Sequence, residues 1–247
     1  MAGQRVYIHE FIHVIGQARA RYMHHMTANW GPIGREQRRQ LCAGVWGVVG
    51  STGRWTEVVN LWEYASWEDL AHNFGFEVSS PTLQDPDLAE WWAVAKDLRS
   101  GGVDRILVAA EWSPSIEELC AAGTSGVAYA HELVGCRAGT APDLLERVRS
   151  GAVDAYREHG LELVGAYRRV MVDDDECLLL WAYPDWEVWA AFEAASAAGS
   201  GPVVQARARW GDLVTSWERI LLVDAELSPL RTGRQPRESD RRPLSEI

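Results

Sequence analysis

The chain of 247 residues contains an internal repeat, and this repeat limits the fold more than any other feature, because a duplicated unit must fold twice and pack against its copy. The segment Tyr7-Ile-His-Glu-Phe11 recurs as Tyr129-Ala-His-Glu-Leu133, at an offset of 129 − 7 = 122 residues. Three further pairs keep the same order while the offset shrinks to 218 − 104 = 114, as small loop deletions would produce: 43–46 with 164–167, 61–67 with 180–186, and 104–108 with 218–222. The sequence therefore predicts two copies, residues 1–112 and 127–227, joined by a connector at 113–126.

Each copy has the pattern of a β-α-β-β-α-β unit. In the first copy, β-branched and aromatic residues at 6–14 predict a strand, and a helical run over 17–26 is expected to end at Asn29-Trp-Gly-Pro32. A hairpin over 42–64, helical runs over 67–74 and 88–98, and a strand over 106–111 complete the unit. The second copy follows the same order, with Asp173-Asp-Asp-Glu176 as its hairpin turn.

This order is that of the ferredoxin-like split motif, in which an antiparallel sheet carries both helices on one face. The bare face of a single sheet would leave apolar surface in water, and two copies can cover it by turning these faces together. We therefore predict an α+β fold in which tandem ferredoxin-like repeats form a pseudo-symmetric, dimeric-type α+β barrel with a central lumen. Residues 228–247 contain five Arg and three acidic residues with little apolar periodicity, which predicts a disordered tail.

Charge and hydropathy exclude several classes of partner. A net charge of −11 opposes a nucleic-acid groove, which needs clustered positive charge. The sequence has no run of 18 apolar residues and no signal-peptide core after Met1, so we expect no membrane partner and a cytoplasmic location. The four cysteines are scattered without metal-ligand spacing, and the glycines of 44–50 lead into a hairpin rather than a helix. Neither a metal site nor a tightly bound dinucleotide is predicted.

Thirteen Trp residues favour a flat organic ligand, and strand alternation supplies candidate positions for its site. We predict that the strand faces with polar side chains line the lumen and, with Trp46 as a further wall, bind substrate. The alternative for each aromatic residue is an ordinary core position. The predicted lining comprises His9, Trp46, Asn60, Trp62 and Tyr64 of the first copy, and His131, Trp181 and Tyr183 of the second.

Three histidines of the first copy have no counterpart in the second. By offset, the residues that correspond to His24, His25 and His72 are Glu146, Arg147 and Ala191. Loss of symmetry after duplication is one way in which one half acquires an active site, so these three are candidates for general base and acid. Asn29 is a candidate for orienting substrate oxygens. The alternative is that these histidines only pack helices or lie on the surface.

Three stretches resemble the ring-opening oxygenases of angucycline biosynthesis, those of the jadomycin, gilvocarcin and kinamycin pathways: 7–11 (YIHEF), 22–33 (YMHHMTANWGPI) and 44–55 (GVWGVVGSTGRW). More distantly, the chain is similar to the dimeric α+β barrels of anthrone oxygenases and NIPSNAP-type proteins. The resemblance implies O2-dependent cleavage of a C–C bond in ring B of a dehydrorabelomycin-like, planar polycyclic substrate. It also implies reduced flavin, FMNH2 or FADH2, as a diffusible cosubstrate supplied by a separate flavin reductase.

Two other classes stay open at this point. One is a haem-dependent enzyme with the same barrel, in which His9 or His131 would be the axial ligand. The other is a ligand-binding barrel protein without catalytic activity. The tandem already supplies the usual dimer within one chain, although sheet edges and exposed Trp side chains would allow a homodimer.

Overall fold

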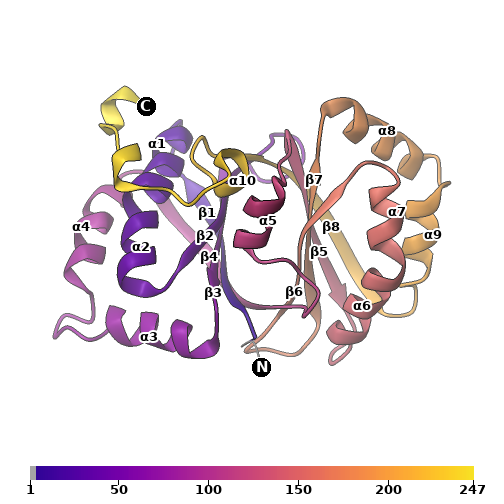
Figure 1. Ribbon diagram of the computed structural model, residues 1–247, viewed down its shortest axis with the longest axis horizontal. Coiled ribbons are helices and arrows are strands. Elements are labelled where there is room, and N and C mark those ends of the chain that lie inside the picture. Colours follow the sequence, from indigo (N-terminus) through magenta and orange to yellow (C-terminus); the bar gives the residue numbers. More distant parts are fainter. Residues whose placement is uncertain (1–3) are drawn as a thin grey trace.

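Eight antiparallel strands close into one barrel in the computed structural model, which describes residues 4–247 except for the side chain of Pro202 (Figure 1). The order around the barrel is β1-β3-β2-β8-β5-β7-β6-β4, and β4 pairs back with β1. Each half thus has the strand order of a ferredoxin-like unit, and the predicted tandem α+β barrel is confirmed. The strands are β1 (Val6–Val14), β2 (Leu41–Val48), β3 (Glu57–Tyr64), β4 (Arg99–Ala109), β5 (Ala128–Cys136), β6 (Glu162–Arg169), β7 (Glu176–Tyr183) and β8 (Val214–Asp224).

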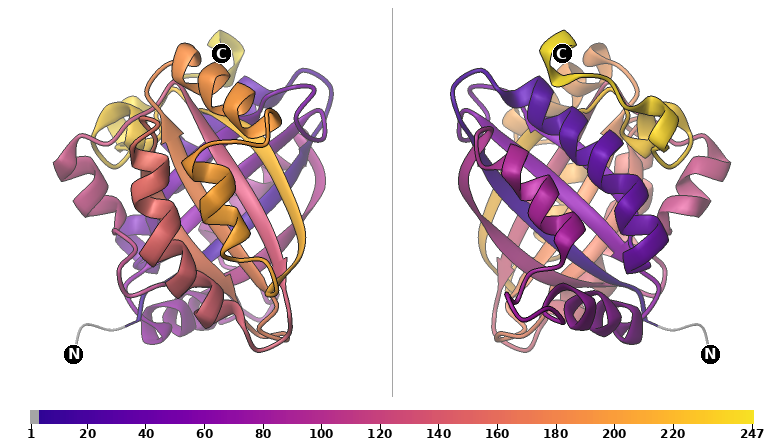
Figure 2. Two further views of the ribbon diagram at one scale, coloured as in Figure 1. Left: turned by 90° about the vertical axis from the view of Figure 1, so that its right-hand side faces the viewer. Right: turned by 90° about the vertical axis from the view of Figure 1, so that its left-hand side faces the viewer.

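Helices cover the outside of the barrel, separately for each half (Figures 1 and 2). Over the first half lie α1 (Arg19–His24), the π-helical segment η1 (His25–Trp30), α2 (Gly31–Arg38), α3 (Trp67–Glu77) and α4 (Pro86–Ala95). Over the second half lie α6 (Ala141–Arg147), the π-helical η2 (Val148–Ala152), α7 (Val153–Arg157), α8 (Trp186–Ala197) and α9 (Pro202–Ala208). Within residues 4–247, no helix combines the length and the apolar content needed to cross a membrane.

The first helical run continues past Asn29-Trp-Gly-Pro32, so the predicted break at this tetrapeptide is wrong. The chain passes from α1 through η1 into α2, and Pro32 lies in the first turn of α2. A proline is tolerated there because the first turn of a helix has no partner for its backbone N–H groups. The extra residue of a π-helical turn also shifts the side chains that follow it, and such turns are frequent at functional sites.

Strand pairing decides which face of each strand points inward. His9 pairs with Leu61 on β3, whereas Glu10 pairs with Asn60 and Ile8 pairs with Trp62. Directly paired residues share a face of the sheet. Tyr7, His9, Phe11 and Leu61 accordingly point into the lumen, while Ile8, Glu10, Asn60 and Trp62 point outward to the helices of the first half.

Two short helices pack against the lumen cluster at one end of the barrel. The connector forms α5 (Ile116–Ala122), and α10 (Pro229–Thr232) follows β8. Ile116 and Leu119 of α5 and Leu230 of α10 belong to the cluster of buried side chains that fills the lumen. Figure 1 shows α5 and α10 close together in front of the barrel.

Residues 228–247 pack against the first half, so the predicted disorder of this tail is wrong. The segment contains α10 and two 3-10 turns, η3 (Glu238–Asp240) and η4 (Leu244–Glu246). The Gln235 side chain accepts a hydrogen bond from the backbone N–H of Cys42 at 2.9 Å and donates one to its carbonyl at 2.8 Å. The backbone N–H of Arg242 donates to Nε2 of His24 at 3.2 Å. Hydrogen bonds with backbone groups fix this segment in place. The prediction of disorder rested on the lack of apolar periodicity, which does not reveal such hydrogen bonds.

Candidate functional site

Packed side chains fill the lumen of the barrel, and a histidine pair lies among them. Nε2 of His9 and Nε2 of His131 are 2.9 Å apart, so one ring donates its N–H to the other across the two halves. Burial lowers the pKa of both histidines, that of His131 to about 3, and keeps the pair neutral at pH 7. Trp46 also lies here, against Tyr129 at 6.0 Å between ring centroids. His9, Trp46 and His131 therefore occupy the lumen, as the sequence predicts.

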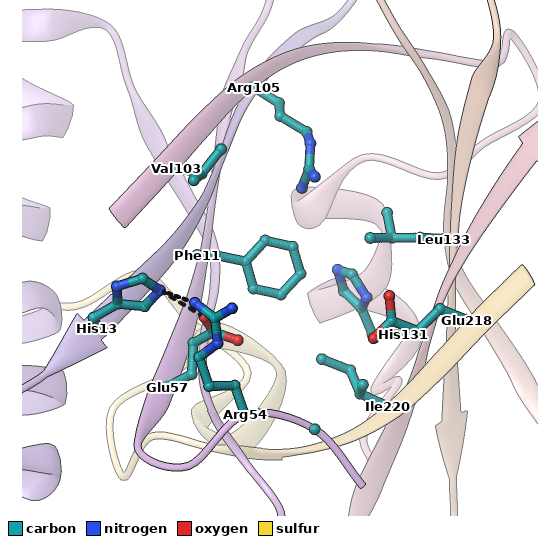
Figure 3. A pocket seen from close by; sticks show the side chains of 11 residues that line it. Phe11, His13, Arg54, Glu57, Val103, Arg105, His131, Leu133, Glu218 and Ile220 are labelled. Atoms are coloured by element: carbon teal, nitrogen blue, oxygen red, sulfur yellow. Dashed lines mark hydrogen bonds and ion pairs between the residues drawn. The ribbon is translucent and has the colours of Figure 1, made fainter. Parts of the chain in front are cut away.

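One end of the lumen opens into a cavity of about 210 Å³, drawn in Figure 3. His131 and Phe11 lie at its inner side, and Arg105 points toward them. At the rim, Arg54 donates to Nε2 of His13 at 2.8 Å, and the same His13 nitrogen lies 3.2 Å from Glu57. A porphyrin is larger than this cavity, and the Nε2 atoms of His9 and His131 face one another rather than an open position. These residues do not fit a haem iron.

The outward strand faces carry the remaining predicted lining residues, so their predicted position in the lumen is wrong. Trp62 and Tyr64 pack against the helices of the first half, and Trp181 and Tyr183 pack against those of the second. Asn60 donates to Glu10 and to the Tyr22 hydroxyl, both outside the lumen. The physical reason is the register of β1 with β3, which places Asn60 and Trp62 beside Glu10 and Ile8 rather than beside His9.

A cavity of about 240 Å³ lies between the sheet and the helices of the first half, and we call it the inner cavity. Five aromatic side chains line it, which suits a flat ring system. Polar side chains reach it from the strands and from α3. The aromatic wall consists of Trp30, Trp62, Phe74, Trp91 and Trp92, and the polar lining consists of Glu10, Gln40, Asn73, Glu77, Arg99 and Asp104.

Glu10 is the central polar group of the inner cavity. Its Oε2 accepts hydrogen bonds from Nδ2 of Asn60 at 2.9 Å and from Nε1 of Trp62 at 2.8 Å. Burial raises the pKa of Glu10, the charge of Asp104 raises it further, and the two hydrogen bonds oppose this shift. A carboxyl group with a raised pKa in an aromatic cavity can accept or return a proton.

Sequence reasoning missed Glu10 as a site residue, although it stands in both copies of the repeated motif. The available signal was an acidic residue in the middle of a strand of mostly apolar residues, repeated as Glu132. Such a residue is costly to bury unless something pairs with it or uses it. Glu10 and His9 lie on opposite faces of β1, so a prediction that places His9 in the site leaves Glu10 outside it.

In the second half, the space next to the equivalent glutamate, Glu132, is filled by side chains of the protein. Glu132 is fully buried and lies 3.5 Å from Arg207 and 3.6 Å from Arg219. The rings of Tyr156 and Trp181 are in contact, with centroids 4.3 Å apart and planes tilted by 39°, and Trp181 donates to Glu132 at 3.1 Å. Trp181 is thus a core residue. The two halves differ in the partners of their equivalent glutamates, because Glu132 lies beside two arginines and Glu10 accepts hydrogen bonds from Asn60 and Trp62.

Strand register explains this difference between the halves. Glu10 on β1 pairs with Asp104, whereas Glu132 on β5 pairs with Arg219. The structural offset of the last strands is therefore 219 − 104 = 115, one more than the sequence motif indicates. The first half has an acidic residue where the second has an arginine, and Glu10 remains partly exposed to the cavity.

His24, His25 and His72, the histidines without a counterpart in the second copy, do not form a cluster. None of them lines the inner cavity. Nε2 of His24 accepts from the C-terminal segment, and the His72 ring packs α3 against α2, 3.3 Å from the carbonyl of Gln37. His25 stacks on Trp91 at 4.9 Å and 9° between the ring planes. Its Nδ1 accepts from Asn29 at 2.8 Å, so its Nε2–H donates to the carbonyl of Trp91 at 3.1 Å.

Asn29 and His25 thus lie outside the inner cavity and line a separate cavity of about 410 Å³, which Trp91 also lines. The segment η1 that carries them also carries Met26 and Trp30, which do line the inner cavity. Trp30 donates to Oε1 of Gln40 at 2.9 Å, and Gln40 donates to the Tyr64 hydroxyl at 2.7 Å. The stretch 22–33, which carries the most specific part of the resemblance, therefore forms one wall of the inner cavity.

Comparison with known proteins defines the class of fold. No family model matches the sequence, and no curated protein matches it. Among solved structures, the chain is similar to α+β barrels of the dimeric type, in which one chain contains both halves of the barrel.

Three of these structures extend over almost the whole chain. A Fusobacterium nucleatum protein, named provisionally as a monooxygenase, has a TM-score of 0.57 and 11% identity over 92% of this chain and 94% of its own. A Lactobacillus acidophilus protein with the same provisional name has a TM-score of 0.57 and 7% identity over 89% and 93%. An anthrone oxidase-like protein has a TM-score of 0.57 and 11% identity over 91% and 93%. At these identities the likeness shows the fold alone.

Proposed function

We propose that this protein is an oxygenase that uses O2 to cleave a C–C bond in ring B of an angucycline-type aromatic polyketide. The observation that carries the proposal is the inner cavity, in which five aromatic side chains lie around Glu10 and Asp104, two carboxyl groups whose pKa is raised by burial. The resemblance of residues 22–33 to angucycline ring-opening oxygenases supports it, because this stretch builds the cavity wall. The likeness of the fold to an anthrone oxidase-like protein is compatible with it.

Glu10 is assigned the proton transfer. A phenol must lose its proton before its ring carbon becomes electron-rich enough to react with oxygen, and a nearby carboxylate can accept that proton. Asn60 and Trp62 hold Oε2 of Glu10 in place from one side. The indole rings of Trp62 and Trp91 stack the substrate and keep water away from the reacting carbon.

The overall reaction needs a source of electrons. One atom of O2 enters the substrate at the bond that breaks and the other leaves as water, which consumes two electrons and two protons. Reduced flavin from a separate reductase is the donor that the resemblance implies. The inner cavity of about 240 Å³ cannot hold a three-ring flavin beside a substrate, so its residues do not fit a bound flavin and we assign it no step there.

The test is a reaction under air with a dehydrorabelomycin-type angucyclinone, with and without flavin reductase, flavin and NADH, followed by mass spectrometry. We expect protein-dependent gain of oxygen and ring opening, and the arm without flavin identifies the electron source. A control without this protein is needed because free reduced flavin makes peroxide. Substrate binding without turnover in every arm would refute the oxygenase and leave a ligand-binding barrel.

A pair of variants isolates the role of Glu10. Glu10→Gln keeps an oxygen that can accept from Asn60 and Trp62 but cannot take a proton, so turnover should fall at least about a hundredfold while the substrate still binds. Glu63→Gln is the matched control, because Glu63 is also a buried carboxyl group with a raised pKa but bonds to Tyr7 and the backbone of Ile116 instead. Equal loss in both variants would contradict the assignment.

A further inference from the structure

A second cavity, of about 520 Å³, opens beside the inner cavity, and we call it the outer chamber. Ile8, Phe74 and Asp104 line both spaces, so the two meet at these residues. The far side of the outer chamber is formed by the second half of the chain, through Val170, Met171 and Val172 at the turn between β6 and β7. The two cavities are therefore adjacent, with the side chains of Ile8, Phe74 and Asp104 between them.

The size of the inner cavity limits what it can hold alone. A cavity of about 150 Å³ accommodates one benzene ring, so about 240 Å³ accommodates roughly two fused rings. A ligand of three or more fused rings with one end at Glu10 must extend past Phe74 into the outer chamber. The outer chamber is predominantly apolar at this point, with Val103 and Ile106 along its floor.

The turn between β6 and β7 presents apolar side chains to solvent at the edge of the outer chamber. Met171 is 78% exposed and Val172 is 56% exposed. Ion pairs of Arg168 with Asp174 at 3.3 Å and of Arg169 with Asp175 at 3.0 Å hold the turn in place. Apolar groups held in water beside a cavity indicate a surface that a ligand covers, and methionine adapts to ligands of different shape.

Two arginines line the outer chamber, and both lie near Glu176, Arg105 at 3.5 Å and Arg169 at 3.8 Å. Nη1 of Arg105 and Nε of Arg169 are buried nitrogens that have no hydrogen-bond partner among the described residues. Buried donors without partners are costly, and a ligand oxygen would satisfy them. A carbonyl or carboxylate oxygen at the outer end of the ligand suits this position.

We propose that a single polycyclic ligand occupies both spaces. Its reacting ring lies in the inner cavity at Glu10, and its distal rings lie in the outer chamber against Met171 and Val172. An oxygen acceptor on the distal rings lies on the side of the outer chamber that Arg169 lines. This inference rests on the proposed function for the class of ligand, and it assigns to the second half of the chain a direct part in selecting ligands of three or more rings.

The test is equilibrium dialysis without oxygen or flavin, so that binding is measured without turnover. The ligands are 1-naphthol, 1-hydroxyanthraquinone and a hydroxylated tetracyclic benz[a]anthraquinone. Met171→Asp places a charge where the distal rings are expected. Leu83→Asp is a matched control, because Leu83 is 71% exposed and, like Met171, has a positive φ, 56° against 66°, but lies outside both spaces. Aspartate tolerates this backbone conformation.

We expect affinity to increase with each added ring. Met171→Asp should weaken the binding of the tetracyclic ligand about tenfold, the effect of losing one partly buried apolar contact, and should leave 1-naphthol within about twofold. Leu83→Asp should change neither. Equal affinity of the two-ring and four-ring ligands, or equal effects of the two variants, would overturn the shared occupancy while leaving turnover in the inner cavity intact. Failure of every ligand to bind would overturn both proposals.

Discussion

The two repeated glutamates allow a sharp test of how each half carries its buried charge. Glu132→Gln removes the negative charge that faces Arg207 and Arg219, whereas Glu10→Gln removes a charge for which no ion pair exists among the described residues. Both variants keep an oxygen that can accept from the neighbouring tryptophan, Trp181 or Trp62. The two substitutions are therefore matched in chemistry and differ only in what the charge does.

The expected magnitudes follow from these surroundings. Removal of one partner of a buried ion pair costs about 3–5 kcal/mol, because the other charge is left uncompensated. The arginine side chains here are each 17% exposed, so water can reach them and the expected loss for Glu132→Gln falls to about 2–4 kcal/mol. Burial raises the pKa of both Glu10 and Glu132, so the difference between the two variants comes from the two arginines within ion-pair distance of Glu132, which have no equivalent at Glu10 among the described residues. Glu10→Gln should therefore change the free energy of unfolding by less than about 1 kcal/mol, or increase it.

Urea denaturation at pH 7, followed by far-UV circular dichroism, measures both changes in the free energy of unfolding. Wild-type protein and Glu63→Gln serve as references, and equal slopes against urea would show that the same surface is exposed in each case. A loss for Glu10→Gln as large as that for Glu132→Gln would refute the reasoning, because it would mean that Glu10 has a strong electrostatic partner in the folded protein.

Three further predictions follow from the contacts described above. Burial lowers the pKa of His9 and His131 below the unfolded value of 6.5, so their contribution to stability is complete above pH 6.5 and is lost as the pH falls. For His131, with a folded pKa of about 3, lowering the pH to 5 should cost about 2 kcal/mol, and His131→Gln should reduce the difference in unfolding free energy between pH 7 and pH 5 by about this amount, while the contribution of His9 remains. Gln235→Ala should cost about 1–2 kcal/mol by the same assay, since two hydrogen bonds to Cys42 disappear, and no loss would contradict the packing of the tail. His25→Ala should raise the KM for substrate about threefold to tenfold with little change in kcat, because Trp91 loses its stacking partner, while His72→Ala should keep both values within about twofold in steady-state assays.

The repeat was sufficient to predict the fold, because a β-α-β-β-α-β unit that occurs twice has few ways to bury both faces of its sheet. It was not sufficient to predict which face lines the lumen. In a barrel covered by helices both faces of a strand are buried, and every residue of β3 is buried. Alternation of polar and apolar residues then separates the two faces without saying which one points inward. The pairing of Asn60 with Glu10, which depends on long-range register, and the packing of Trp62 and Tyr64 against the helices of the first half together decide the question.

The histidines illustrate a second limit of sequence reasoning. The two halves do differ in their helix–sheet layers, but the difference does not lie at the histidines that fixed sequence offsets single out. The decisive difference lies at two positions that the motif offset of 114 does not align, Asp104 and Arg219, which the structure places opposite equivalent glutamates. An arginine there closes the second half with an internal cation, and an aspartate leaves the first half with an open, acidic and aromatic space. A shift of one residue in strand register, rather than a gain of histidines, thus separates a half that is closed by its own side chains from a half that can take a ligand.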